Sequence, residues 1–132
     1  MGSNLTNKIM KYFRANQHDV IDNINFRNVV YTAKHIQIVF MSVPAGEEIG
    51  EEVHDKHDQT FVIVAGEAKV IIGAEKIPVH PGDLIVIPVG VYHNVKSLGP
   101  HDLKMYSFCS PPHHPPKTIH PTRESAVSFQ EH

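Results

Sequence analysis

The sequence lacks what a disulfide scaffold or a membrane span requires. It has a single cysteine, Cys109, so no disulfide can form within the chain, and its first residues do not read as a secretion signal. Both features are typical of a reducing compartment, so we expect a cytoplasmic protein and a buried Cys109 thiol. The longest apolar runs, FVIVA and LIVIPV, are much shorter than the roughly 20 residues that cross a bilayer. We therefore expect no contact with a membrane.

An excess of charge of either sign is also missing. The 132 residues include 12 lysines and arginines against 14 aspartates and glutamates, which gives a formal net charge of -2 without a basic block. Proteins that bind nucleic acid concentrate basic side chains on one face, so the sequence excludes nucleic acid as a partner. Its length suits one domain with a sizeable core, and we expect a single domain over residues 1–132.

Short apolar runs separated by glycine and proline turns are abundant. The runs are rich in valine, isoleucine and aromatic residues, and no amphipathic segment of 10–15 residues interrupts them. This pattern predicts an all-β fold, either a small barrel or a two-sheet jelly roll, rather than a parallel α/β sheet. The predicted strands are 28–33, 35–43, 59–65, 68–73, 75–80, 84–88, 93–98 and 103–110, with a further extended piece at 46–54.

The segments on either side of the predicted barrel core, residues 28–110, have a different character. Residues 4–27 form an N-terminal arm, and apolar residues at helical spacing between 4 and 13 predict a short helix there. Residues 111–132 form a C-terminal tail with five prolines between 111 and 121, which predicts an extended chain.

The end of this tail contains a second helix signal. Thr122 is placed to cap a short helix that ends at Phe129. Apolar residues such as Ile119 favour docking of the tail on the barrel over a free tail. His113, His114 and His120 could cover the mouth of the barrel or bind adventitious metal, but we expect them to be exposed, since polar residues of terminal segments usually are.

The stretch EEVHDKHDQTFVIVAGE places two histidines among carboxylates just before an apolar strand. Side chains two residues apart share a face of an extended chain, so Glu52 and His54 face the same way. His57 joins them only if the chain turns just before it. After such a turn, Gln59 would begin the returning strand. The simpler alternative is a solvated hairpin end with surface histidines.

Two spaced patterns resemble the two motifs of the cupin family, and the resemblance covers about residues 30–110. Membership of the family implies a conical jelly-roll barrel (a double-stranded β-helix) with a metal near its centre. That metal is usually held by two histidines and a glutamate of the first motif and one histidine of the second. The patterns are Gly46-x5-Glu52-x-His54-x4-Gln59-x6-Gly66 and Gly82-x5-Pro88-x-Gly90-x2-His93.

This chain departs from the family at two ligand positions. Glu52 stands where the first histidine is usual, and Gln59 stands where the glutamate is usual. The resemblance thus implies a metal site of Glu52, His54, Gln59 and His93. Two imidazole nitrogens and two oxygens suit iron, manganese, nickel or zinc, and are too rich in nitrogen for calcium or magnesium. The loss of one carboxylate should weaken metal binding and raise the Lewis acidity of the ion.

Two functions remain open at this point. One is a metal-dependent enzyme of the oxygenase, isomerase or decarboxylase type, acting on a small organic molecule, with Glu48 or His57 moving a proton. The other is a non-catalytic module that binds a small molecule or a sugar, since Gln59 weakens the metal set. An empty, vestigial site is a further alternative. We also expect a homodimer, as small cupins often are, and a pocket lined by Phe61, Tyr92, Tyr106 and Phe108.

Overall fold

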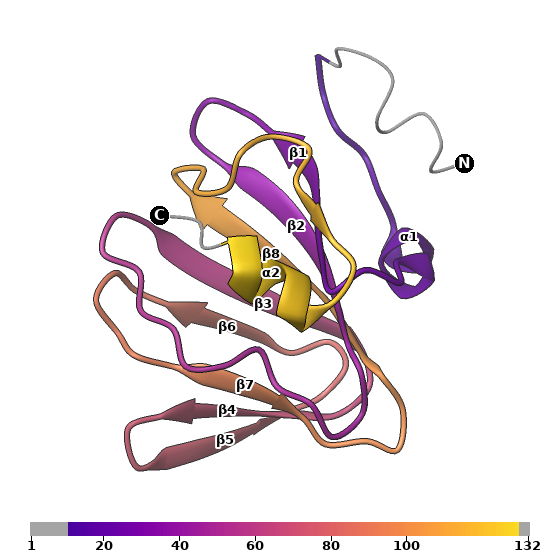
Figure 1. Cartoon of the computed structure of the whole chain (residues 1–132), viewed down its shortest axis with the longest axis vertical. Helices are drawn as coiled ribbons and strands as arrows, with labels where there is room; N and C mark the ends of the chain where they lie inside the picture. Colours follow the sequence, from indigo (N-terminus) through magenta and orange to yellow (C-terminus); the bar gives the residue numbers. More distant parts are fainter. Residues whose placement is uncertain (1–10, 130–132) are drawn as a thin grey trace.

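Short strands and tight turns fold into two antiparallel sheets in the computed structural model, which describes the backbone of residues 11–129 and the side chains of residues 11–127. The larger sheet has the order β6-β3-β8-β2-β1-β9, and the smaller has the order β5-β4-β7 (Figure 1). The elements are α1 (Gln17–Asp22), β1 (Arg27–Thr32), β2 (Gln37–Val43), β3 (Asp58–Ala65), β4 (Ala68–Ile72), β5 (Glu75–Val79), β6 (Leu84–Ile87), β7 (Asn94–Ser97), β8 (Leu103–Ser110), β9 (Ile119–His120) and α2 (Arg123–Phe129). All eight predicted strands are present, and the all-β double-stranded β-helix is confirmed. Neither helix has the length or the apolar character needed to cross a bilayer.

The segment 46–54 runs beside β7 without becoming a regular strand. Isolated bridges join Glu48 to Lys96 and Glu52 to His93. Between them, Gly50 adopts a φ of 95°, which interrupts the alternation of an extended chain. Side chains on either side of Gly50 therefore do not follow one continuous two-residue period.

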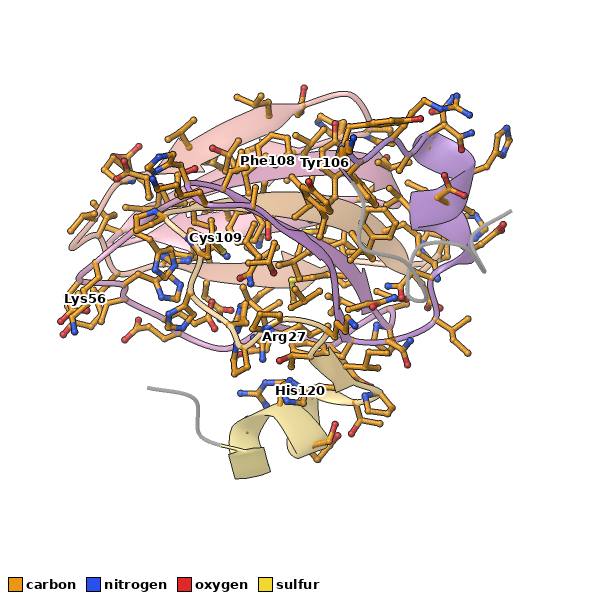
Figure 2. All side chains as sticks on the ribbon, turned by 90° about the horizontal axis from the view of Figure 1, so that it is seen from above. Arg27, Lys56, Tyr106, Phe108, Cys109 and His120 are labelled. Atoms are coloured by element: carbon orange, nitrogen blue, oxygen red, sulfur yellow. The ribbon has the colours of Figure 1, made fainter. Side chains whose placement is uncertain are left out.

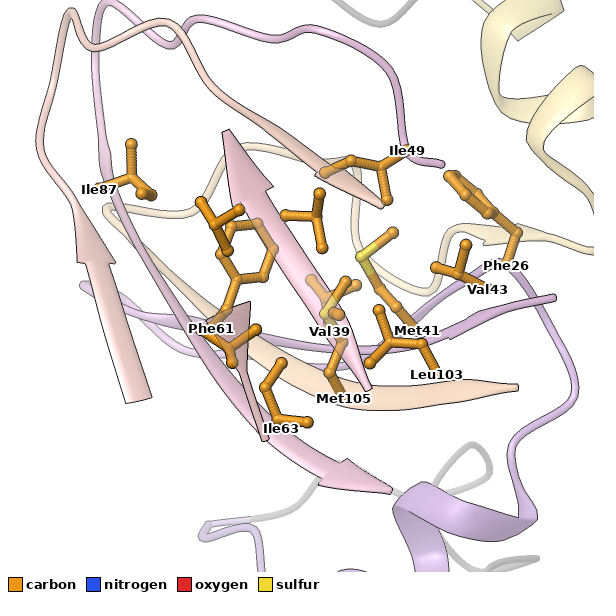
Figure 3. Close-up of a cluster of buried hydrophobic side chains, with 14 of the residues drawn as sticks. Phe26, Val39, Met41, Val43, Ile49, Phe61, Ile63, Ile87, Leu103 and Met105 are labelled. Atoms are coloured by element: carbon orange, nitrogen blue, oxygen red, sulfur yellow. The ribbon is translucent and has the colours of Figure 1, made fainter. Parts of the chain in front are cut away.

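The core lies between the two sheets, and strand register decides which residues enter it. In the β3–β8 pair, Phe61 is opposite Ser107 and Ile63 is opposite Met105, and all four are at most 1% exposed (Figure 3). Because alternate residues point to opposite faces, Tyr106 and Phe108 lie on the outer face of β8. Figure 2 shows them on the opposite side of the sheet from Arg27.

Most of the helix predicted between residues 4 and 13 lies outside the described residues, and residues 11–13, which are described, are not helical. The first described helix, α1, begins after Asn16. The Asn16 side chain accepts a hydrogen bond from the Asp19 amide, and the Asp19 carboxylate accepts one from the Asn16 amide. This capping box, rather than apolar periodicity, sets where the helix begins.

The C-terminal tail docks on the larger sheet, as predicted. Its strand β9 pairs with β1, and α2 begins after Thr122, whose hydroxyl accepts a hydrogen bond from the Ser125 amide at 3.2 Å. Ala126 of α2 is part of the hydrophobic core. In Figure 1 the yellow α2 follows directly after β9, the strand that it contacts.

Gln37 holds the proline-rich part of the tail in place. Its side chain is fully buried, and its Oε1 accepts hydrogen bonds from the amides of His113 and His114 at 3.2 and 2.9 Å. Its Nε2 donates to the carbonyl of His114 at 2.8 Å. The expectation that the three tail histidines are exposed is therefore wrong: His113 and His114 are partly buried, and His120 is buried. The reason is that a buried amide side chain must satisfy both of its ends.

Candidate metal centre

Three side chains from the two sequence patterns converge at one end of the core. The Oε1 atom of Glu52 lies 3.6 Å from Nε2 of His54 and 3.9 Å from Nε2 of His93. The ligand atoms of the three residues all lie within 4.8 Å of one another. Atoms bound to one ion at about 2.0–2.2 Å are separated by roughly 3–4 Å, so small movements would bring these three onto an ion.

Backbone hydrogen bonds fix two of these residues before any ion binds. Glu52 and His93 form a bridge in which each amide donates to the other's carbonyl, at 2.8 and 2.9 Å. The carbonyl of His54 accepts a hydrogen bond from the Gly90 amide at 2.7 Å. The second pattern is thus attached to the first by main-chain contacts at both ends of the cluster.

The ring of His93 is oriented for ligation. Its Nδ1 lies 3.0 Å from the carbonyl oxygen of Val91. A carbonyl only accepts hydrogen bonds, so Nδ1 carries the proton, and Nε2 presents its lone pair to the cluster. A backbone partner of this kind is a usual outer contact of a metal-bound histidine. The edge of the Phe61 ring, 6.1 Å away between centroids, packs against the same imidazole.

The carboxyl group of Glu52 is ionised at neutral pH. Burial acts to raise its pKa, but the nearby His54 ring, the Arg27 guanidinium and the His93 ring outweigh this and hold the pKa below its usual value. The closest guanidinium nitrogen of Arg27 lies 3.9 Å from Oε2. The cluster therefore offers a negative oxygen as well as two imidazole nitrogens.

Buried polar atoms without a partner identify the interior of the site. Among the described side chains, Nε2 of His54, Nε2 of His93 and Oε1 of Gln59 are buried and make no hydrogen bond. Such atoms are rare in native proteins and call for an explanation. All three belong to groups that can donate an electron pair to a metal ion, so the residues present fit a bound divalent transition metal.

His57 lies beside the cluster because the chain bends at residues 55–56. Its ring centroid is 4.2 Å from that of His54 and 4.5 Å from that of His113, and its Nε2 is buried without a hydrogen bond. Burial, with the His54, His113 and His114 rings nearby, lowers the pKa of His57 to about 4. Burial and the charge of Arg27 lower the pKa of His114 to about 3. Both rings are neutral at neutral pH.

A cavity of about 760 Å³ opens beside the ligand cluster. This volume lies within the range of sites that hold small molecules. The strands and the bend before β3 supply Glu52, His54, His57, Gln59 and Ser107, and the docked tail supplies His113, His114 and Arg123. The tail therefore forms part of the cavity wall.

Residues 39–109 match the family model described as a cupin domain. The chain belongs to the cupin family. It is 38% identical over 115 residues to the uncharacterized protein YrkC of Bacillus subtilis, and the match covers 83% of this cupin and 62% of YrkC. This cupin thus spans less than two thirds of that relative's length.

Two further comparisons bear on the fold and on the class of function. The crystal structure of BH2720 from Bacillus halodurans superposes with a TM-score of 0.87 at 32% identity, and the match covers 90% of this cupin and 95% of that chain. The quercetin 2,3-dioxygenase of Bacillus subtilis is 27% identical over 74 residues, which covers 56% of this cupin and 22% of the dioxygenase.

The structure of this cupin places several expected site residues elsewhere. Glu48 points away from the cavity: its carboxylate accepts a hydrogen bond from the Asn94 side chain at 3.1 Å and lies 3.8 Å from the Lys96 ammonium. The turn at Gly50 is the reason, since it separates Glu48 from the face that Glu52 occupies.

The four aromatic residues expected in the pocket do not line this cavity. Phe61 is buried in the core, and Tyr92 is 60% exposed. Tyr106 and Phe108 line a second hollow of about 630 Å³ on the outer face of the larger sheet, with Phe13 and Phe40. The alternate residues of β8 face inward: Ser107 lines the cavity, and Cys109 is fully buried.

Arg27, Ser107, His114 and Arg123 are cavity residues that the sequence analysis missed. The sequence contained a signal for Ser107, because it lies two residues after Met105 on β8 and so faces the same side of the strand. The sequence contained no signal for the two arginines, since both lie outside the cupin patterns; Arg27 reaches the cavity from β1, and Arg123 reaches it from the docked tail.

Proposed function

We propose that this cupin binds one divalent transition-metal ion, iron, manganese, nickel or zinc, through Glu52, His54, Gln59 and His93. We propose further that it acts on a small organic molecule in the adjoining cavity. The observation that carries this proposal is the set of buried ligand atoms that have no partner within the described chain. Nitrogen-rich sites with one carboxylate favour these metals over calcium and magnesium.

The reaction class follows from the ligand chemistry and from the cavity. A bound ion of this kind supplies positive charge that polarises a carbonyl or enolate oxygen of the substrate. The chemistry is thus of the oxygenase, isomerase or decarboxylase type. The partial match to a quercetin 2,3-dioxygenase supports this class without naming a substrate.

His57 is the residue that moves a proton in this proposal. Its pKa of about 4 keeps the ring neutral at physiological pH; the residue lines the cavity, and its buried Nε2 makes no hydrogen bond to any described residue. A neutral imidazole within reach of the bound molecule accepts a proton from it. Glu48 does not share this role, because its carboxylate is paired outside the cavity.

Metal analysis tests the proposal directly. Protein purified without a chelator or an affinity tag is expected to contain about one transition-metal ion per chain by mass spectrometry of the elements. The His93→Gln variant is expected to lose most of this metal. His101→Gln is the matched control, since His101 is exposed and outside the cavity. A parent protein without stoichiometric metal would overturn the proposal.

A non-catalytic binding module is the second candidate, and Gln59 favours it. A neutral amide in place of a carboxylate leaves the metal set with one negative charge, which weakens retention of the ion. Turnover of an enediol or diketone substrate that requires metal and is lost in His57→Gln supports the enzyme. Ligands that raise the melting temperature of a protein with no turnover support the binding module. The homodimer and the cytoplasmic location stay predictions.

A further inference from the structure

Two arginines outside both cupin patterns face the cavity. Arg27 begins β1, Arg123 begins α2, and both belong to the cavity lining. The remaining charged side chains of the lining, apart from Glu52, are exposed at its rim: Glu51, Asp55 and Lys56. The enclosed part of the cavity therefore holds two cations against one anion, and a divalent metal would make it more positive still.

Arg27 is held in place but keeps hydrogen-bond donors to spare. Its side chain is 12% exposed, and its Nη1 lies 3.2 Å from Nδ1 of His120. Its Nη2 is 3.9 Å from the Glu52 carboxylate, which is longer than a hydrogen bond. A guanidinium has five N–H donors, so most of those of Arg27 have no protein acceptor among the described residues.

Arg123 is positioned by the backbone of the first pattern. Its Nε donates to the carbonyl of Ile49 at 3.2 Å, and its guanidinium lies against Gly50. A Cβ at position 50 would come within 2.6 Å of Nη2, so a side chain there would displace the guanidinium from this position. Neither terminal nitrogen makes a hydrogen bond within the described chain. Arg123 follows three residues after His120, the partner of Arg27, so the docked tail brings both arginines to one region.

Other groups of the cavity lining indicate the chemistry of the rest of the ligand. Ser107 and His57 line the cavity, and the Ser107 hydroxyl and Nε2 of His57 are buried with no hydrogen-bond partner among the described residues. Phe26, Met41 and Ala126 supply apolar surface in the same cavity. A molecule with an anionic head and an apolar body would match both kinds of surface.

We infer that this cavity binds a small organic carboxylate, with the carboxylate group held by Arg27 and Arg123. The planar fork of a guanidinium pairs with a planar carboxylate through two parallel hydrogen bonds, and such charge-assisted bonds are the strong ones. The inference rests on the proposed function in taking the same cavity as the ligand site. It deepens that proposal by naming the ligand class.

Calorimetric titration with matched probes tests this assignment. Benzoate and hexanoate are compared with benzamide and hexanamide, their neutral amides, on metal-loaded protein and on chelator-treated protein. The carboxylates are expected to bind about tenfold or more tightly than the amides. Arg27→Gln and Arg123→Gln are each expected to remove most of this preference. Arg14→Gln is the matched control, because Arg14 is exposed and outside the cavity lining.

Arg27→Lys is the control for a folding defect, because it keeps the positive charge but lacks the planar guanidinium. It should bind carboxylates with an intermediate preference over the amides, and its melting temperature should equal that of the parent. Equal binding of amides and carboxylates, or a preference that survives both glutamine variants, overturns the inference. If the protein holds no metal and the arginines still select carboxylates, the metal proposal fails and this inference stands. If metal is bound and the carboxylates bind no more tightly than the amides, this inference fails and the metal proposal stands.

Discussion

The Nε2 atom of His93 lies 3.9 Å from Oε1 of Glu52, and the backbones of the two residues exchange both of their amide hydrogen bonds. The spacing of these ligand atoms is thus set by a main-chain bridge between distant segments. The conformations of the flexible side chains contribute less to this spacing. A site built on paired backbone keeps its geometry before the ion arrives, which lowers the cost of binding.

Restoring a carboxylate at position 59 should strengthen metal binding and weaken the metal-free fold. Gln59 is 6% exposed, and its Oε1 has no hydrogen-bond partner in the described structure. In Gln59→Glu, a buried negative charge without metal is costly, whereas a bound cation neutralises it. We expect about tenfold or more tighter metal binding and a melting temperature that falls in chelator but rises with metal. Gln59→Leu should lose metal affinity, and a Glu variant that binds metal no better than the parent would contradict this expectation.

Acid should destabilise the metal-free protein through two histidines of the cavity wall. The folded-state pKa values of His57 and His114, about 4 and about 3, lie below the usual value of 6.5. Between these values the unfolded chain binds protons that the folded chain does not. The stabilising contribution is therefore complete above about pH 6.5 and is lost as the pH falls toward the folded values. Urea midpoints at pH 7 and pH 5 measure this loss, and His57→Gln should reduce it.

His80 provides the control of opposite sign for this experiment. Its ring is paired with the Glu67 carboxylate, and the hydrogen bond and charge of Glu67 raise the pKa of His80. Its contribution is present below the unfolded pKa and is lost as the pH rises through the folded value. His80→Gln should leave the acid loss intact. An acid loss of equal size in the parent and in His57→Gln would contradict the assignment to His57.

Two glycines with similar backbone angles should differ in their tolerance of a side chain. Gly66 and Gly82 have φ values of 85° and 95°. A Cβ at Gly66 would lie 2.5 Å from the carbonyl oxygen of Asp102, whereas a Cβ at Gly82 meets nothing within 4 Å. Gly82→Ala should cost about 1–2 kcal/mol for the positive φ alone. Gly66→Ala should cost at least about 1 kcal/mol more, because backbone must move. Equal urea midpoints for the two variants would show that the close approach is relieved without cost.

Removing the amide of Gln37 should release the tail from the cavity wall. Gln37→Leu leaves the amides of His113 and His114 and the carbonyl of His114 without the partner they have in the parent. Unsatisfied buried polar groups cost about 1–3 kcal/mol each, so we expect a loss of about 2 kcal/mol or more. Limited proteolysis should cut the variant faster between residues 111 and 121. Gln17→Leu, at an exposed position of α1, is the control, and equal cleavage in both variants would argue against the role of Gln37.

Local signals explain why the strands were predictable. Runs of β-branched and aromatic residues bounded by glycine and proline specify extended chain and turns through contacts near in sequence. The same locality holds for the two ligand patterns: the bend before His57 and the turns at Gly82 and Gly90 are short-range features. The glycines of these turns, Gly66, Gly73, Gly82 and Gly90, all adopt positive φ, as their residue type permits.

Which face of an extended segment points inward was harder to predict, for a physical reason. On β8 both faces are largely apolar, with Met105 and Cys109 on one and Tyr106 and Phe108 on the other, so hydrophobicity alone does not choose the inner face. The pairing with β3 makes that choice. Similarly, Gly50 breaks the alternation that would have placed Glu48 with Glu52.

The sequence by itself determined the strands, the cupin family and the identity of the candidate ligands, because each depends on spacing within short stretches of chain. Only the tertiary structure decided what surrounds those ligands. The docked tail brings Arg123 and two histidines to Arg27 and Glu52, through contacts between segments that lie far apart in the chain. Such contacts depend on how the sheets and the tail pack together, and packing of this kind leaves no periodic pattern in the sequence.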